Sequence, residues 1–242
     1  MYRFSLLVML LSLFSCNQGI ETENAFDLGY DYFPILSKGT VYTYSVAITI
    51  YGNEGKDIKN LSFFQREDII ESSKDERGRG FFRKDIFQSK TRKEPWLYIG
   101  STSFEVNDLQ VIENNLYDDR IINVSFPVAE KKQWDGLALI GDSKMKDING
   151  EKIDFYSNWD FEIVEVGAPY DVYDDVITIS QADHENALQK RNSVEIYAKG
   201  IGLVSKEQWI LDTQCLDDCA GQNWEKKVHN GIILKMNLVE LK

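Results

Sequence analysis

Few side chains in this sequence are suited to acid–base or nucleophilic catalysis near neutral pH. Histidine is the group that titrates in that range, and the chain has two, His184 and His229. They lie far apart in sequence and in no metal-ligand spacing, so we expect both at the surface. The sequence contains no Gly-x-Ser-x-Gly elbow, no His-Glu-x-x-His motif and no phosphate-binding glycine loop. We therefore predict no catalytic residue, no metal site and no cofactor.

The first 15 residues have the features of a secretory signal peptide. Arg3 precedes an apolar run, residues 4–14, which is too short to span a hydrocarbon core of about 30 Å as a helix. The window Leu13-Phe14-Ser15-Cys16 resembles the lipobox of bacterial lipoproteins, in which the cysteine is acylated with chains such as palmitate. We predict that residues 1–15 are removed and that Cys16 carries the lipid. The alternative is an ordinary cleaved signal with a chance cysteine.

The other two cysteines, Cys215 and Cys219, are close together in sequence. Export places them in an oxidising compartment, where neighbouring thiols usually pair, so we predict a disulfide. The loop is short, and its closure is expected to contribute only about 2 kcal/mol. A metal-binding loop with Asp217 and Asp218 is the alternative, although no histidine or second cysteine pair lies nearby.

The 39 acidic residues leave two further alternatives open. Paired carboxylates can hydrolyse glycosidic bonds, but spacing along the chain does not report their separation in space. Oxygen ligands for Ca²⁺ are concentrated at Asp118-Asp119, at Asp171 with Asp174-Asp175, and in residues 147–154. The last group contains Asn149-Gly150, a pair typical of a two-residue hairpin turn, which favours a structural role there.

The net charge of −12 at pH 7 excludes some partners. An acidic surface repels nucleic-acid phosphates, so we expect no nucleic-acid binding. The only membrane association we expect is through the N-terminal lipid. Hydrophobic residues make up 43% of the chain and aromatic residues 12%, which is enough for a folded core. Residues 16–27 are polar and without periodicity, and we predict a flexible tether there.

Alternation of apolar and polar residues dominates the rest of the chain. It is clear in residues 42–50, 153–163 and 234–238, and it predicts half-buried antiparallel strands. Turn pairs such as Lys199-Gly200 separate these runs. Only residues 103–117 and 181–191 are candidates for short helices. We interpret most of the aromatic residues, including the five tryptophans, as core and cross-strand pairs rather than a binding platform.

Three sets of motifs occur in order along the chain. They are Tyr32-Phe33-Pro34 through Gly39 with Tyr42-Thr43-Tyr44; Phe126-Pro127 with Trp134-Asp135-Gly136; and Asp175-Val176-Ile177-Thr178-Ile179 followed by Tyr197-Ala198-Lys199-Gly200-Ile201-Gly202-Leu203-Val204. Together they resemble an uncharacterised envelope lipoprotein family of Bacteroidota-type bacteria. The resemblance implies a strongly curved antiparallel sheet or an incomplete barrel, with no assigned catalytic residue. The chain departs from it at Lys132, where glycine is usual, and in the Cys215–Cys219 pair.

We therefore expect a single, mainly β domain over residues 28–242. The repeated Phe-Pro element leaves open two related halves with a boundary near residue 128. The expected function is a non-catalytic binding or assembly component of the cell envelope, for an apolar small molecule or an envelope protein. A glycan or envelope hydrolase and a purely structural scaffold are the alternatives. We expect the outer membrane, on its periplasmic face rather than the cell surface, because Glu21 and Glu23 follow Cys16 late and sparsely.

Overall fold

The computed structural model describes residues 28–242, except 94, 142–144, 149, 216–218 and 220. The predicted signal peptide, Cys16 and the tether lie outside the described residues. Strands dominate, which confirms the predicted fold class. In chain order the elements are η1 (Tyr30–Tyr32), β1 (Val41–Gly52), β2 (Asp57–Lys74), β3 (Gly80–Ser89), β4 (Leu97–Val106), β5 (Gln110–Asn114), β6 (Arg120–Ser125), β7 (Gln133–Trp134), β8 (Met145–Ile148), β9 (Glu151–Asp154), β10 (Phe161–Tyr170), β11 (Tyr173–Glu185), β12 (Gln189–Ala198), β13 (Gly202–Asp212), α1 (Trp224–Lys227) and β14 (Asn230–Leu241).

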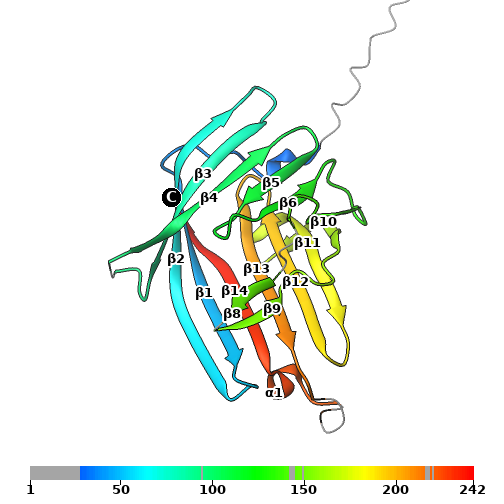
Figure 1. Cartoon of the computed structure of the whole chain (residues 1–242). Helices are drawn as coiled ribbons and strands as arrows, with labels where there is room; N and C mark the ends of the chain where they lie inside the picture. Colours follow the sequence, from blue (N-terminus) through cyan, green and yellow to red (C-terminus); the bar gives the residue numbers. More distant parts are fainter. Residues whose placement is uncertain (1–27, 94, 142–144, 149, 216–218, 220) are drawn as a thin grey trace, which may run out of the picture.

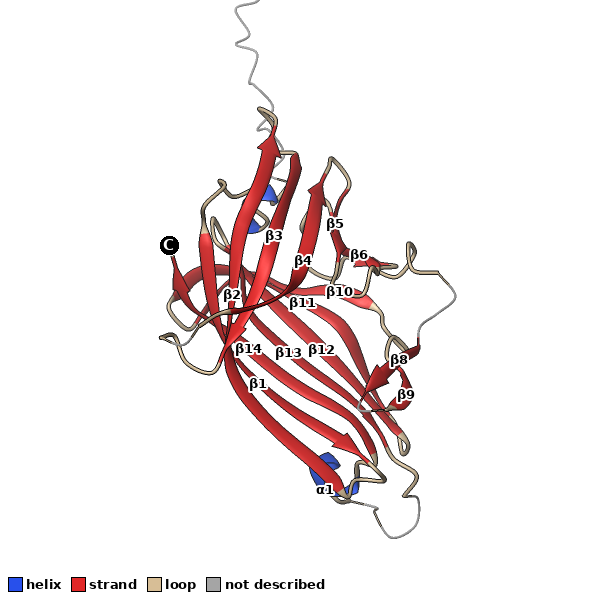
Figure 2. Cartoon of the chain, turned by 60° about the vertical axis from the view of Figure 1, so that its left-hand side comes forward, coloured by secondary structure: helices blue, strands red, loops and turns tan. Residues whose placement is uncertain are grey.

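Twelve of these strands form one antiparallel sheet in the order β6-β5-β4-β3-β2-β1-β14-β13-β12-β11-β10-β7. Most neighbours in the sheet are also neighbours in sequence, with two exceptions. β1 lies beside β14, which joins the two ends of the described chain, and β10 lies beside β7. The long strand β2 pairs with β1 along its first part and with β3 along its second. The sheet therefore turns sharply at β2, and β2 to β5 rise away from the sheet formed by β1 and β14 to β11 (Figure 2).

The two edges of the sheet meet, so that the sheet nearly closes on itself. The backbone N–H of Ile122 in β6 donates to the carbonyl of Gly136, just after β7, at 2.9 Å. The indole N–H of Trp134 in β7 donates to the carbonyl of Ile122 at 2.7 Å. Gly136 is required here because a Cβ at this position would collide with the ring of Phe161. We call this contact between β6 and β7 the seam; it protects edge groups that would otherwise stay unpaired.

Two segments outside the large sheet fill the ends of its interior. Tyr32, Phe33 and Ile35 pack into the largest buried cluster, between β4 to β6 and β10 to β12. The hairpin of β8 and β9 lies against β13 and β14, where Ile153 contacts Ile210 (Figure 1). In the described residues no helix is long and apolar enough to cross a membrane.

Both helices expected from the sequence are wrong. Residues 103–117 form the end of β4, β5 and the turn after it, and residues 181–191 lie in β11 and β12. The Asn residues in these segments cap turns: Asn107 Oδ1 accepts from the backbone N–H groups of Leu109 and Gln110 at 2.9 and 3.1 Å. Asn186 Oδ1 accepts in the same way from Leu188 and Gln189, each at 2.8 Å. The polar residues therefore mark tight hairpins, as asparagine side chains often do.

The single strand expected over residues 153–163 is also wrong. β9 ends at Asp154, a turn follows in which Asn158 has φ of 57°, and β10 begins at Phe161. The apolar periodicity continues through the turn because Phe155, Tyr156 and Trp159 pack on one another, with ring centroids 5.1 to 6.0 Å apart. The expected strands at residues 42–50 and 234–238 are confirmed as parts of β1 and β14.

Candidate functional site

The interior of the sheet contains a cavity of about 370 Å³. Its wall is formed by inward-facing side chains of β1 to β6 and β11 to β14, together with residues from the two segments that fill its ends. The volume falls within the range of about 300–1,000 Å³ found for small-molecule sites. The expectation for a purely structural scaffold, a filled interior, is therefore not met.

Most of the cavity wall is apolar. Phenylalanine and tryptophan side chains come from β2, β3, β4, the segment before β1 and the segment after β9, and aliphatic side chains come from β1, β14 and several other strands. The principal apolar residues are Phe63, Phe82, Phe104, Phe155, Trp159, Val46, Ile48, Leu234 and Met236. Phe82 and Phe104 stack in parallel across adjacent strands at 4.8 Å. Such a surface favours the apolar part of a ligand because its burial removes water from both.

Five acidic or basic side chains converge on the same cavity: Glu67, Lys84, Glu113, Glu195 and Lys206. We call them the interior charge cluster. They come from five different strands, and four of them form two ion pairs. Lys84 Nζ lies 2.6 Å from Glu67 Oε2, and Lys206 Nζ lies 2.7 Å from Glu195 Oε1. Burial would penalise each charge alone, and the pairing offsets that cost.

Glu195 is the most fully satisfied member of the cluster. Burial by itself would raise its pKa, but Lys206 and hydrogen bonds from neighbours outweigh this and hold the pKa of Glu195 below its ordinary value. One of those bonds comes from Tyr197, whose hydroxyl donates to Glu195 Oε2 at 2.5 Å. For Lys206, burial would lower the pKa, yet the nearby carboxylates, Glu195 foremost, raise it. Both groups of this pair are therefore charged at neutral pH.

Glu113 is in a different state. Its Oε2 accepts a hydrogen bond from Asn123 Nδ2 at 2.8 Å, and among the described residues no ammonium or guanidinium lies within ion-pair distance of it. Burial raises the pKa of Glu113 above its ordinary value, against the opposing effects of Lys206 and Lys84. The cavity therefore holds one carboxyl group with a raised pKa and one with a lowered pKa.

The histidines expected at the surface do not line the cavity. His184 is half-buried near the end of β11, with its Nε2 3.0 Å from the side-chain amide of Asn186. His229 Nδ1 accepts from the backbone N–H of Gln214 at 3.1 Å, beside the cysteine loop. In the described part of the chain no three His, Cys, Asp or Glu side chains form a group that could hold a metal ion.

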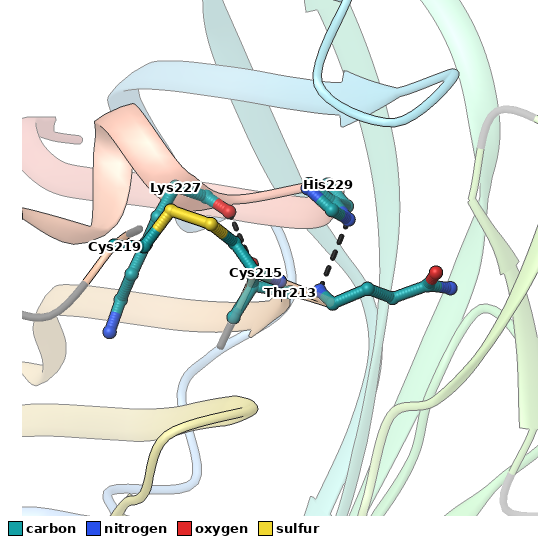
Figure 3. The surroundings of a disulfide bond; sticks show 6 residues. Thr213, Cys215, Cys219, Lys227 and His229 are labelled. Atoms are coloured by element: carbon teal, nitrogen blue, oxygen red, sulfur yellow. Dashed lines mark hydrogen bonds between the residues drawn. A yellow bond between two sulfur atoms is a disulfide. The ribbon is translucent and has the colours of Figure 1, made fainter. Parts of the chain in front are cut away.

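Cys215 and Cys219 are joined by a disulfide in the structure, with Cα atoms 5.8 Å apart. The residues just before the loop are tied to the end of α1, where Thr213 Oγ1 donates to the carbonyl of Lys227 at 2.5 Å (Figure 3). The disulfide lies in the connection between β13 and α1, and neither of its cysteines lines the cavity. A role at the cavity is not indicated for it, and its oxidation in the purified protein stays a prediction.

Sequence reasoning missed the interior charge cluster, although a signal for it exists. Lys84 occupies the same phase of β3 as Phe82 and Ile86, and Glu67 precedes Ile69 in the same phase of β2. A charged residue on the apolar side of an alternating strand is costly to bury without a partner. The chain has 66 Lys, Arg, Asp and Glu residues, and residues of these types are common on protein surfaces. The two positions therefore do not stand out in the sequence.

No protein-family model and no curated protein matches the chain. Two solved structures are similar to this one. The first, described as a candidate lipoprotein from Parabacteroides distasonis ATCC 8503, is 12% identical with a TM-score of 0.41, over 87% of this chain and 98% of that one. The second, described as a candidate exported protein with a YmcC-like fold from Bacteroides fragilis NCTC 9343, is 13% identical with a TM-score of 0.39, over 86% and 98%.

Proposed function

We propose that this chain is a lipid-anchored, non-catalytic protein of the cell envelope that binds a small amphipathic molecule inside its curved sheet. The observation that carries the proposal is the cavity of about 370 Å³, with a mostly apolar wall and charged groups gathered within it. An amphipathic molecule matches both parts of this wall. The predicted lipid on Cys16 would hold the binding domain close to a membrane, where such molecules are found.

The tightly bonded state of Glu195 supports binding over hydrolysis. A hydrolase of the two-carboxylate type needs one protonated carboxyl group and one free carboxylate beside the scissile bond. Burial raises the pKa of Glu113, which brings this carboxyl group closer to the first requirement. Both oxygens of Glu195, however, are engaged by Lys206 and Tyr197, so this carboxylate is not free to attack or to activate water. A polymer would also have to thread through an interior ringed by strands.

Native mass spectrometry of the full-length protein, purified from its own envelope in mild detergent, tests the proposal. We expect a small molecule that remains bound and is released on gentle activation. The same spectrum, recorded before and after reduction, reports whether the Cys215–Cys219 pair is oxidised. A protein that carries no ligand from its envelope and takes none up from envelope lipid extracts would contradict the proposal.

The hydrolase alternative has its own test. Incubation with envelope glycans should release no new reducing ends above the level of the double variant Glu113→Gln/Glu195→Gln. Turnover that the double variant abolishes would establish the alternative instead.

A further inference from the structure

The interior charge cluster is not neutral when all its members are ionised. Three carboxylates face two ammonium groups, and the two ion pairs account for Glu67, Lys84, Glu195 and Lys206. Glu113 is left over. The other charged pair near the cavity, Lys146 with Asp119, is balanced within itself at 2.7 Å. With all five groups ionised, the enclosed space therefore carries one uncompensated negative charge, on Glu113.

The surroundings of Glu113 locate that charge at the cavity wall. Glu113 lies in β5, and Val111 in the same strand and Asn115 just after it also line the cavity. Asn123 from β6 donates to its Oε2, while in the described structure no protein donor reaches its Oε1. Glu113 Oε1 is not among the fully buried side-chain atoms that lack a hydrogen-bond partner. This oxygen is therefore accessible from the cavity.

Charged and titratable groups face Glu113 from several strands. Lys84 in β3, Lys206 in β13 and Glu195 in β12 act on its carboxyl group through space. The hydroxyl groups of Tyr156 and Tyr197 are close enough for Glu113 to influence them. None of these supplies a cation in contact with Glu113. Any cation in contact with Glu113 would therefore come from outside the described protein.

We infer that the ligand of this cavity carries one positive charge, as an amine on an apolar body, and that Glu113 binds the amine. The inference rests on the proposed function, because it specifies the chemistry of the molecule held in the cavity. An ammonium group beside Glu113 balances the interior charge and supplies donors for the free carboxylate oxygen. The apolar body then lies along the aromatic and aliphatic wall formed by residues such as Phe63, Phe104 and Trp159.

An anionic ligand fits the same wall less well. Both ammonium groups are already bound by carboxylates at 2.6 and 2.7 Å, so an anion would compete with Glu67 and Glu195 for them. With all five groups of the cluster ionised, it would also add a second negative charge to an interior that already has one in excess. Burial of unpaired charge is among the most costly changes a protein interior can undergo.

Three probes of equal chain length separate these cases: decylamine, decan-1-ol and decanoate. Their binding is measured at pH 8 by the fluorescence of Trp159 and the other tryptophans, or by calorimetry. The full-length protein is held in amphipol, with protein-free amphipol as the blank for partitioning. We expect decylamine to bind at least tenfold more tightly than decan-1-ol, and decanoate to bind more weakly than either.

Two variants assign the preference to one carboxylate. Glu113→Gln keeps the shape and removes the charge, and we expect it to weaken decylamine binding at least tenfold while decan-1-ol binding changes less than threefold. The matched control is Glu105→Gln, which removes an exposed carboxylate from the outer side of the neighbouring strand β4. It should leave the binding of all three probes unchanged. Retained decan-1-ol binding shows that each variant is folded.

The outcomes distinguish this inference from the proposed function. If decanoate binds most tightly, or if amine and alcohol bind equally, the amine assignment is overturned while the cavity remains a binding site. An amine preference that survives Glu113→Gln overturns the role of Glu113. If none of the three probes binds and the native mass spectrum shows no bound ligand, both the inference and the proposed function fail.

Discussion

Glu113 should lower the stability of the empty protein at neutral and higher pH. Its pKa in the folded protein is raised, chiefly by burial, so the unfolded chain loses this proton first as the pH rises. Between the two pKa values the folded state binds more protons, and the free energy of unfolding falls with rising pH. The Glu113→Gln substitution removes the titrating carboxyl group, so this fall in the free energy of unfolding should be absent from the variant.

We expect the Glu113→Gln variant to be more stable than the native protein at pH 8 by on the order of 1 kcal/mol. The difference should vanish below about pH 4.5, the ordinary pKa of glutamate, because both states are then protonated. Urea unfolding across this range, with bound ligand removed, measures it. A variant that is less stable than the native protein at pH 8 would show that Glu113 is not destabilised by burial.

Removing a charge from the Lys206–Glu195 pair should lower the free energy of unfolding, whereas removing the charge of Glu113 should raise it. Lys206→Met leaves a buried carboxylate without its cation, and we expect a loss of about 3 kcal/mol in unfolding free energy. Adding Glu195→Gln should recover part of that loss, because the unpaired charge is gone. The control is Lys235→Met, which breaks the exposed pair with Glu207 on the neighbouring strand and should cost less than about 1 kcal/mol. Equal losses in the two lysine variants would contradict the burial argument.

At the scale of the elements, the seam between β6 and β7 decides whether the sheet surrounds a cavity or lies open. It depends on few interactions: β7 has only two residues, and Trp134 supplies one of the two hydrogen bonds that join it to β6. A seam held by so few bonds is expected to open more readily than the long ladders between β1 and its neighbours.

Trp134→Phe should loosen the seam without unfolding the sheet. Phenylalanine keeps a ring against Phe161 but cannot donate to the carbonyl of Ile122. We expect a loss of about 1–2 kcal/mol and faster hydrogen exchange at the backbone N–H of Ile122. Trp209→Phe is the matched control: it removes an indole bond of the same 2.7 Å length, to Glu207, on a strand away from the seam. Unchanged exchange at Ile122 in the Trp134 variant would show that the seam does not depend on the indole.

For the whole molecule, the predicted lipid determines where the cavity is presented. Cys16→Ala removes the acylated sulfur, and we expect the protein to move from the membrane fraction to the soluble fraction. Incorporation of labelled palmitate should be lost at the same time, because the residue that would accept the acyl chain is gone. Cys215→Ala is the control and should leave both measurements unchanged. A Cys16→Ala protein that stays with membranes would contradict the anchor.

The sequence by itself determined the local structure that follows from alternation and turn chemistry. Apolar and polar residues alternate in residues 42–50, which lie in β1, and Gly150, with φ of 85°, lies in the turn between β8 and β9. These features depend on residues that are close in sequence. The expected helices failed for a related reason: Asn107 and Asn186 satisfy backbone N–H groups in hairpin turns, which a helical interpretation of polar segments overlooks.

Only the tertiary structure decided the closure of the sheet and the content of its interior. Alternation indicates that Lys84 and Glu113 share a side of their strands with apolar residues, but it cannot state which strands face one another. The meeting of β6 with β7 brings those sides around one space, where two carboxylates find ammonium partners and Glu113 does not. Charge balance is a property of that enclosed volume, because Coulomb interactions depend on distances in space rather than positions along the chain.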